Sequence, residues 1–153
     1  MSATAGEAPY VLDGLMLGAG ALPLHEHYTD TGGATDHVFA LCHLLGFRFV
    51  PRLRDIADRK LGSIAAPSTY KGIESLMGRT IKTAAIEADW DDIVRIVASI
   101  KEGAVAPSAI LRKLAAYKRQ NRLDFALAEL GRIERTLFAL DWLEQPDLRR
   151  ACQ

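Results

Sequence analysis

Residues 22–54, LPLHEHYTDTGGATDHVFALCHLLGFRFVPRLR, contain the signals that decide the fold of this chain. Polar and apolar residues alternate over residues 22–28, which predicts a β-strand, and the glycine-rich residues 29–33 predict a turn. A helix is expected next, and residues 47–54 alternate again as in a second strand. This order of strand, turn, helix and strand predicts one α/β unit.

The predicted helix has recognisable ends. Thr35 is a suitable N-cap, because its hydroxyl can accept a hydrogen bond from the first helical turn, and Asp36 favours the positive end of the helix dipole. Gly46 is a suitable C-cap, since glycine readily adopts the left-handed conformation that ends many helices. Four apolar residues recur at helical spacing and are expected to face the core. They are Val38, Leu41, Cys42 and Leu45.

The strand predicted over residues 47–54 has one apolar and one basic face, because successive side chains point to opposite sides. Pro51 cannot donate a hydrogen bond to a neighbouring strand, which favours a place at the edge of a sheet. Two strands alone do not form a stable sheet, so the unit is expected to belong to a larger one. The apolar face consists of Phe47, Phe49, Pro51 and Leu53, and the basic face of Arg48, Arg52 and Arg54.

The chain divides into four segments by composition. Residues 1–9 are small and polar, and we expect them to be disordered. Residues 10–54 contain the α/β unit. Residues 55–88 are interrupted by glycine and proline and are predicted to be an irregular insertion. Residues 89–150 are predicted to be helical, so a small α/β core is followed by a mostly α-helical part.

Three helices are expected in this C-terminal part. The first begins at Asp89 as N-cap and closes at Gly103, the second begins after Pro107, and the third runs from about Asp124 to Leu143. Their apolar stripes are expected to face the core, together with Trp142. The stripes are Trp90, Ile93, Val94, Val97 and Ile100 in the first helix, Ile110, Leu111 and Leu114 in the second, and Leu127, Leu130, Ile133, Leu137 and Leu140 in the third.

The composition limits the class of protein. The 19 basic and 19 acidic residues give a net charge of zero, which is unusual for a self-sufficient DNA-binding domain. No apolar run reaches the roughly 18 residues of a membrane span, and no signal peptide is recognisable. The two cysteines, Cys42 and Cys152, are far apart in the sequence. We therefore expect a cytoplasmic protein without disulfides and without a membrane partner.

The clearest candidate for chemistry is Asp30. It lies where the first strand ends and the glycine-rich turn begins, and α/β folds often place catalytic groups there. A carboxylate at that place can bind a hard cation such as Mg²⁺. The alternative is a structural role, with Asp30 in an Asx-turn and Asp36 at the start of the helix.

The histidines suggest a second kind of site. Histidine is a common ligand of zinc and other transition metals, and two of these residues share one face of the first strand. No spacing matches a zinc signature, and ordinary hydrogen bonding around the turn is the alternative. The residues concerned are His25, His27, His37 and His43.

Two groups of basic residues are candidates for contact with DNA phosphates. The basic face of Arg48, Arg52 and Arg54, with Arg59 and Lys60 beyond it, is the better candidate, although a solvated strand face explains the same pattern. A second group at a helix end is better explained as a solvated last turn that is favourable to the helix dipole. It contains Arg112, Lys113, Lys118, Arg119 and Arg122.

The stretch HYTDTGGATDHVFALCHLLGFRFVPRLRD over residues 27–55 resembles the Tn-three family of replicative, DDE-type DNA transposases. The similarity resumes in residues 111–114, in residues 119–121 and in ELGRIERTLF over residues 129–138. It implies a partial ribonuclease H-like catalytic core that acts on transposon ends and target DNA. In this family three carboxylates bind two Mg²⁺ ions, and Asp30 matches the second carboxylate, with Thr29 and Asp36 as neighbouring candidates.

The resemblance also implies that parts of the enzyme lie outside this chain. The first catalytic aspartate of the family belongs to a strand upstream of Tyr10, and the catalytic glutamate should follow soon after Arg150. Residues 61–80 depart from the family pattern. One carboxylate cannot bind two metal ions, so we expect this chain alone to be inactive. The alternative is a non-catalytic module that binds DNA, associates with itself or associates with an intact transposase.

Overall fold

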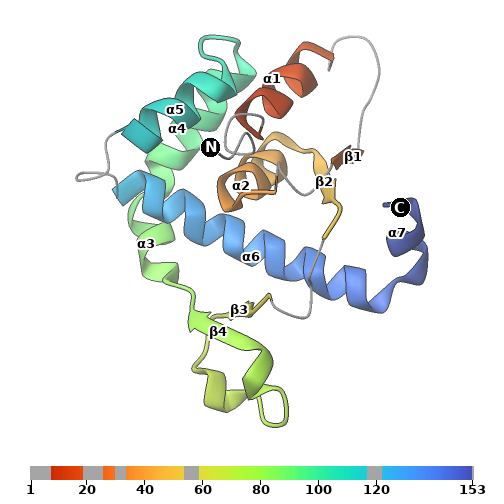
Figure 1. The fold of residues 1–153 in the computed structure, drawn as a ribbon. Helices are drawn as coiled ribbons and strands as arrows, with labels where there is room; N and C mark the ends of the chain where they lie inside the picture. Colours follow the sequence, from red (N-terminus) through yellow and green to blue (C-terminus); the bar gives the residue numbers. More distant parts are fainter. Residues whose placement is uncertain (1–7, 19–25, 30–33, 54–58, 117–121, 153) are drawn as a thin grey trace.

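A computed structural model describes the chain over residues 8–18, 26–29, 34–53, 59–116 and 122–152. Figure 1 shows a strand pair and helix α2 near the centre, helices α1, α4 and α5 on one side, and the pair β3–β4 on the other. Helix α6 runs across the molecule between these two sides. Every structural statement below concerns the described residues.

The central unit consists of strand β1 (Glu26–Thr29), helix α2 (Asp36–Leu45) and strand β2 (Arg48–Pro51). The two strands pair in parallel, with Glu26 opposite Arg48 and Thr29 opposite Pro51. Two parallel strands need a crossover connection between them, and α2 lies within that connection. The predicted order of strand, helix and strand is therefore confirmed.

Helix α2 begins and ends as its sequence predicts. The Thr35 hydroxyl oxygen accepts a hydrogen bond from the backbone N–H of Val38 at 3.3 Å. Gly46 has a φ angle of 88°, the left-handed conformation expected of a C-cap. The helix is buried over much of its surface, because it packs against both β2 and α6. Its buried residues are Val38, Phe39, Ala40, Leu41, Cys42 and Leu45.

Strand β2 is more deeply buried than the alternation predicts. Val50 belongs to the face that we predicted to be basic, yet it is 1% exposed. Parallel strands are commonly covered on both faces, and one-sided alternation does not describe them. The face therefore carries a buried valine between Arg48 and Arg52, which are both exposed. Residues 22–25 and Arg54, which we included in the predicted strands, lie outside the described residues.

Helix α1 (Ala8–Gly18) precedes the central unit and packs against α5 (Pro107–Ala116). The Asp13 carboxylate accepts hydrogen bonds from the backbone N–H and the hydroxyl of Ser108, at the beginning of α5. An acidic side chain from α1 thus satisfies one of the unpaired backbone N–H groups at the α5 N-terminus. The helix includes Ala8 and Pro9, so the prediction of disorder over residues 1–9 was wrong for these two residues. Residues 1–7 lie outside the described part.

Residues 59–88 are more regular than we predicted from their glycines and prolines. Strands β3 (Leu61–Ser63) and β4 (Met77–Thr80) pair in parallel, and helix α3 (Thr83–Ala88) follows. Strands of three and four residues are too short to show a clear alternation in sequence, which is why the pattern did not reveal them. Two short 3₁₀ turns lie between the strands, η4 (Pro67–Thr69) and η5 (Glu74–Leu76).

The helices predicted in the C-terminal part are present as α4 (Trp90–Lys101), α5 and α6 (Arg122–Glu144), and a short α7 (Pro146–Ala151) follows. Asp89 is the N-cap residue of α4, as predicted, but its side chain makes no capping hydrogen bond. Its carboxylate lies 3.2 Å from the Arg122 guanidinium instead. Trp90 was predicted in the core but is 43% exposed.

The predicted apolar stripe of α6 is only partly correct. Leu127 is buried, as expected, but Leu137 and Leu140 are 52% and 44% exposed. Long helices with leucines on more than one side do not indicate which side meets the core. Packing against α2 selects a different stripe toward the end of α6. It contains Phe138, Ala139 and Trp142, so the prediction for Trp142 is confirmed.

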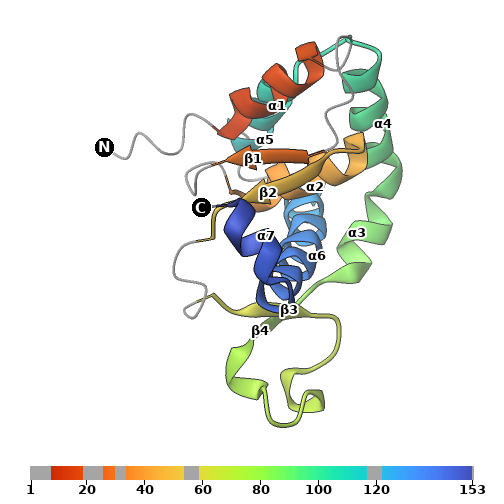
Figure 2. The same ribbon diagram turned by 90° about the vertical axis from the view of Figure 1, so that its right-hand side faces the viewer.

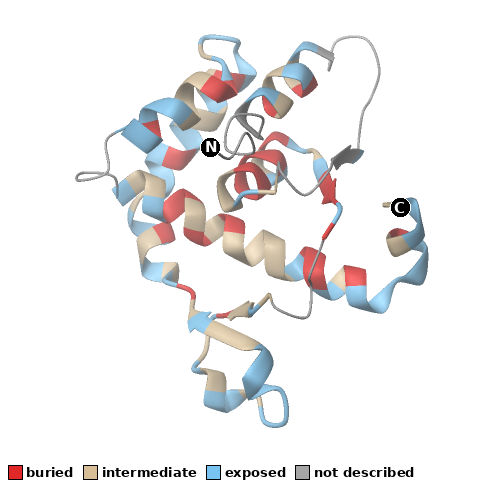
Figure 3. Cartoon of the chain, viewed as in Figure 1, coloured by how far each residue is buried: buried red, intermediate tan, exposed pale blue. Residues whose placement is uncertain are grey.

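The described part of the chain is mainly helical, with two separate pairs of parallel strands. Figure 2 shows that β3–β4 lies apart from β1–β2 in the second view as well. Buried residues concentrate in α2 and along one side of α6 (Figure 3). No described helix has the length and apolar character that a bilayer crossing needs. The small β1–α2–β2 unit confirms an α/β element, while a complete ribonuclease H-like core stays a prediction.

Candidate functional site

The end of β1 is the place where the sequence predicts catalysis. Thr29 is the last residue of β1 and pairs with Pro51 of β2, so the carboxyl ends of both strands meet at one edge. Asp30 follows Thr29 directly in the chain but lies outside the described residues, and the Thr29 side chain does too. Arg52 follows Pro51 and is exposed at the same edge. This edge is where parallel α/β units place their ligands.

Arg48 lies at the opposite end of β2. Its guanidinium Nη1 is 3.1 Å from Glu26 Oε1 and donates a hydrogen bond to it. Its Nη2 lies 3.9 Å from the Asp141 carboxylate of α6. Arg48 is thus partly neutralised by two carboxylates and is separated from Arg52 along the strand, so the structure does not bring the two arginines together.

Asp36 lies in the first turn of α2, which begins six residues after Asp30. Its Oδ1 is 3.0 Å from Nη1 of Arg135 in α6. The Asp36 backbone also lies against α6, because a Cβ atom at Gly131 would come within 1.7 Å of the Asp36 carbonyl oxygen. The carboxylate that we predicted beside the metal site therefore has an arginine partner on another helix.

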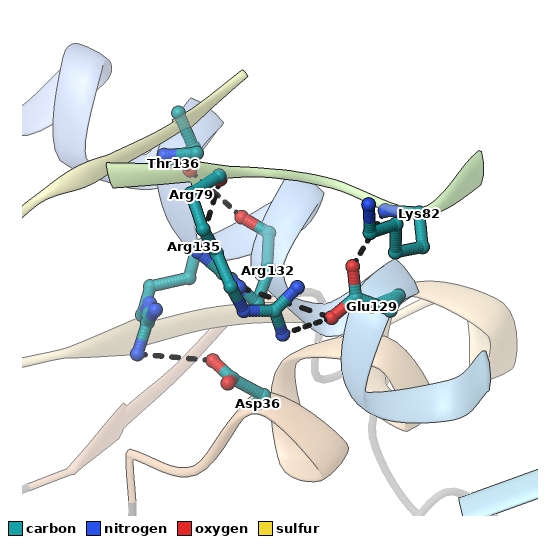
Figure 4. A network of polar contacts seen from close by, with 8 residues as sticks. Asp36, Arg79, Lys82, Glu129, Arg132, Arg135 and Thr136 are labelled. Carbon is teal, nitrogen blue, oxygen red and sulfur yellow. Dashed lines mark hydrogen bonds and ion pairs between the residues drawn. The ribbon is translucent and has the colours of Figure 1, made fainter. Parts of the chain in front are cut away.

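A buried carboxylate, Glu129, connects α6 to β4 (Figure 4). Its side chain is 0% exposed. One oxygen accepts a hydrogen bond from the Arg79 guanidinium, and the other accepts one from the backbone N–H of Lys82 at 2.7 Å. Arg132 Nη1 lies 3.8 Å from the same carboxylate. A buried charge needs such partners to remain ionised.

The electrostatics of this network follow from those contacts. Burial alone would raise the pKa of Glu129, but the hydrogen bonds from Arg79 and Lys82 and the charges of Arg79 and Arg132 outweigh it, so the pKa lies below its ordinary value. Burial, followed by repulsion from Arg79, lowers the pKa of the Arg132 guanidinium. The Glu129 carboxylate is therefore negatively charged, and it is the shared ion-pair partner of Arg79 and Arg132.

Sequence reasoning assigned no role to Glu129, Gly131, Arg132 or Arg135. All of them fall in the stretch over residues 129–138 that we quoted for the family resemblance. The available signal was a glutamate and two arginines at helical spacing on a helix that also carries a long apolar stripe. That pattern does not distinguish a buried network from a solvated helix face.

The histidines of α2 contact carboxylates of α6. His37 Nε2 lies 2.7 Å from Asp124 Oδ1, and His43 Nδ1 lies 3.4 Å from Glu134 Oε2. The described residues contain no group of three or more histidine, cysteine, aspartate or glutamate side chains arranged to bind a metal ion. His25 and the His27 side chain lie outside the described part.

The described arginines of the second basic group contact different partners. The Arg112 guanidinium lies 5.8 Å from the centre of the Tyr10 ring, and its Nε donates to the Ser108 carbonyl at 3.4 Å. Arg122 pairs with Asp89 across the start of α4. These contacts favour the structural interpretation of this group.

Comparison with known proteins gives consistent matches over the whole chain. The family described as the Tn3 transposase DDE domain matches residues 1–153. The transposase of transposon Tn501 from Pseudomonas aeruginosa is 55% identical over 144 residues, and that of Tn21 from Escherichia coli is 52% identical over the same length. The transposase of Tn1546 from Enterococcus faecium is 46% identical over 147 residues. These matches cover 94% to 96% of this chain but only 15% of each relative.

Proposed function

The chain belongs to the Tn3 transposase DDE domain family, and from this premise we propose that it forms part of a catalytic domain for DNA strand cleavage and transfer at transposon ends. In this proposal Asp30 supplies one of three carboxylates. The observation that carries it is the parallel pairing of β1 and β2, because Asp30 follows the β1 residue opposite Pro51, at the carboxyl edge of the pair.

The remaining residues of this edge have supporting roles in the proposal. Arg52 is at the strand end and suits contact with a DNA phosphate, and Arg54 lies two residues further along the chain. Arg48 suits this role less well, since Glu26 and Asp141 already lie beside its guanidinium. Thr29 is adjacent to Asp30 in the chain. The Asp36 carboxylate pairs with Arg135 of α6.

The family implies two Mg²⁺ ions, which polarise the scissile phosphate and activate the attacking oxygen. The described residues do not form such a site by themselves, because they contain no cluster of three potential metal ligands. Asp36, the first described carboxylate after Asp30 in the chain, is paired with Arg135. Metal binding by Asp30 therefore requires carboxylates from further segments of the intact enzyme, which the family resemblance places outside residues 10–150.

Two properties of the isolated chain follow from this proposal. It does not cleave or join DNA, because one carboxylate cannot bind two metal ions. Within a larger transposase, we expect the chain to act on DNA in the bacterial cytoplasm. Metal-dependent strand transfer by the isolated chain, abolished by Asp30→Ala, would contradict the first property.

A chimaeric transposase tests the role of Asp30. The Tn501 enzyme is a suitable host, since this chain matches 15% of its length at 55% identity. With this chain in place of the matching stretch, we expect strand transfer that falls to background in Asp30→Ala and Asp30→Asn. Asp92→Asn is the matched control, because Asp92 is exposed on α4 and pairs only with Arg95 among its described contacts. Full strand transfer by the Asp30→Asn enzyme would disprove the assignment.

A non-catalytic role is the second candidate, and an exposed apolar face favours it. Leu137 and Leu140 of α6, with Ile64 and Ile73 near β3–β4, line a groove of about 330 Å³. Such a face suits association with another protein segment, including another copy of this chain or an intact transposase. A gel-shift titration separates the candidates: a DNA-binding module shifts DNA at low salt and loses affinity as salt rises. An associating module changes the sedimentation of the intact enzyme without DNA.

A further inference from the structure

Helix α6 carries apolar side chains on two sides, and the described residues cover one of them. Phe138 lies on the side that meets α2, with its ring centre 5.8 Å from that of Phe39. Ile133, Leu137 and Leu140 lie on another side, at the spacing of four and three residues that places side chains on one face of a helix. Leu137 and Leu140 are 52% and 44% exposed. The helix therefore keeps an apolar stripe available for a further partner.

This stripe forms one wall of a groove of about 330 Å³, and the segment around β3 and β4 forms the other wall (Figure 1). On this second wall, Ile64 and Ile73 are 69% and 43% exposed. None of the described residues that line the groove carries a charge. The groove is therefore an apolar surface on the outside of the molecule.

The polar side chains of the groove have little to offer a ligand. The Thr136 hydroxyl accepts a hydrogen bond from the Gly62 backbone N–H at 2.9 Å and donates one to the Arg132 carbonyl oxygen at 2.8 Å. The Ser63 hydroxyl donates to a backbone carbonyl oxygen two residues further along the chain. Tyr70 is the remaining polar side chain among the described lining residues. Binding in this groove must therefore depend mainly on apolar contact.

The two walls of the groove are fixed relative to each other. The hydrogen bond between Thr136 and Gly62 joins α6 to β3 directly. The Glu129 carboxylate joins α6 to the backbone N–H of Lys82, just after β4. A Cβ atom added to Gly62 would come within 2.7 Å of the Ile81 side chain, so this wall is closely packed from behind. A groove with fixed walls binds its partner at a smaller cost in conformational entropy.

The chemistry of the groove selects an apolar protein segment as its occupant. DNA binding needs cationic side chains that neutralise phosphates, and the described lining has none. Exposed apolar patches of this kind mark protein interfaces. The wall on α6 presents its leucines at helical spacing, and such a stripe packs well against the side chains of another helix. An amphipathic helix with apolar residues three and four positions apart therefore fits the groove.

We propose that this groove holds an amphipathic helix from a part of the same transposase polypeptide that lies outside residues 1–153. The inference rests on the proposed function, because it presupposes that the chain is part of a larger transposase, but it makes no use of Asp30. The relatives support a partner in the same polypeptide, since the stretch that matches this chain is only 15% of each of them. A tethered segment reaches a far higher effective concentration than a separate copy in solution.

The first experiment places a photo-crosslinking residue, p-benzoylphenylalanine, at Leu137 in the chimaeric Tn501 transposase. We expect crosslinks to an apolar-faced helical segment outside this chain, identified by mass spectrometry of the digested protein. Oligomers assembled from unlabelled and heavy-nitrogen-labelled chains show whether a crosslink joins two parts of one polypeptide. The same residue at Val94 is the matched control, because Val94 of α4 is 47% exposed and does not line the groove.

Three results of this experiment would overturn the proposal. Crosslinks from Leu137 that join differently labelled chains would show that a second copy fills the groove. Crosslinks to DNA, or none to protein outside this chain, would show that no helix of the transposase covers it. Equal crosslinking of the same segment from Val94 would show that the contact is not specific to the groove.

The second experiment measures amide hydrogen exchange of the crosslinked segment in the chimaera. Leu137→Asp should raise this exchange about tenfold, because the docked helix would bury a carboxylate without a polar partner. Val94→Asp should leave it unchanged. Leu137→Ala is a second variant that introduces no charge, and it should raise the exchange by a smaller factor, about threefold.

The outcomes separate this inference from the proposed function. Unchanged exchange in both Leu137 variants, in a chimaera that Asp30→Asn inactivates, would overturn the docking surface alone. Full strand transfer by the Asp30→Asn enzyme, with the expected crosslinks from Leu137, would overturn the proposed role of Asp30 and leave the docking surface standing.

Discussion

Gly131 of α6 lies so close to Asp36 of α2 that a Cβ atom added to the glycine would come within 1.7 Å of the Asp36 carbonyl oxygen. The contact is between two backbones, and neither partner can move aside as a flexible side chain can. It occurs at the first turn of the helix that follows the predicted catalytic turn. The distance between α2 and α6 therefore depends on the absence of a side chain at this one residue.

Replacing this glycine should strongly destabilise the protein. An alanine in a helix interior usually stabilises it by about 1 kcal/mol relative to glycine. At Gly131 we expect the opposite sign, with a loss of about 3 kcal/mol or more, because α2 and α6 must separate. Gly14→Ala in α1 is the matched control, since a Cβ atom there meets nothing within 4 Å. Urea unfolding of both variants measures the difference, and a Gly131→Ala protein as stable as wild type would refute the contact.

The buried Glu129 carboxylate should make stability depend on pH at the acid end. Its pKa is lowered in the folded state, despite burial that would raise it, by hydrogen bonds from Arg79 and Lys82 and by nearby arginine charge. A lowered folded pKa stabilises the fold above the unfolded value of about 4.3. This contribution disappears as pH falls from that value through the folded pKa.

Glu129→Gln should therefore cost roughly 1–3 kcal/mol at neutral pH, because it removes the charge partner of the largely buried Arg132 and of the half-exposed Arg79. The cost should shrink as pH falls below about 4.3, because the unfolded wild-type chain takes up a proton at Glu129 at a higher pH than the folded chain does. Asp92→Asn is the comparison, as its exposed pair with Arg95 contributes about 0.5 kcal/mol or less. A Glu129→Gln penalty that does not vary between pH 3 and pH 7 would contradict the assigned charge state.

Arg48 of β2 and Arg52, which follows the end of this strand, should differ in their effect on DNA affinity. Arg52 follows Pro51, the residue opposite Thr29 in the strand pair, whereas Arg48 lies at the other end of β2 with Glu26 and Asp141. In the chimaeric transposase, Arg52→Ala should weaken DNA binding and reduce the salt slope of log K by about one. Arg48→Ala should have the smaller effect. Fluorescence anisotropy over a salt series measures both, and equal slopes for the two variants would refute the distinction.

The two cysteines should differ in reactivity. Burial raises the pKa of the Cys42 thiol to about 12, so at pH 8 almost none of it is the reactive thiolate. Burial also raises the pKa of Cys152, but this residue is only partly buried. We expect iodoacetamide to label Cys152 in the folded chain and to label Cys42 only after unfolding. Mass spectrometry after timed labelling detects this order, and early modification of Cys42 would show that α2 is open at this point.

Local signals in the sequence determined the central unit. Thr35 and Gly46 define the two ends of α2 through capping, which needs only the hydroxyl of threonine and the conformational freedom of glycine. The alternation in residues 22–28 and 47–54 marks the strands that flank it. The motif over residues 27–55 also indicated the transposase family, which the match over residues 1–153 confirms. The assignment of Asp30 stays a prediction.

Only the tertiary structure decided which faces are buried and which charges meet. The leucines of α6 allow several stripes, and packing against α2 buries Phe138 and leaves Leu137 exposed. Glu129 and Arg79 are 50 residues apart in sequence, and no local pattern predicts that they form a pair. The contact between Gly131 and Asp36 could not be predicted from the sequence either, because the close approach of two backbones does not alter the spacing of apolar residues along a helix. Local chemistry therefore specified the elements of this protein, while the contacts that hold them together arise between residues that are distant in the chain.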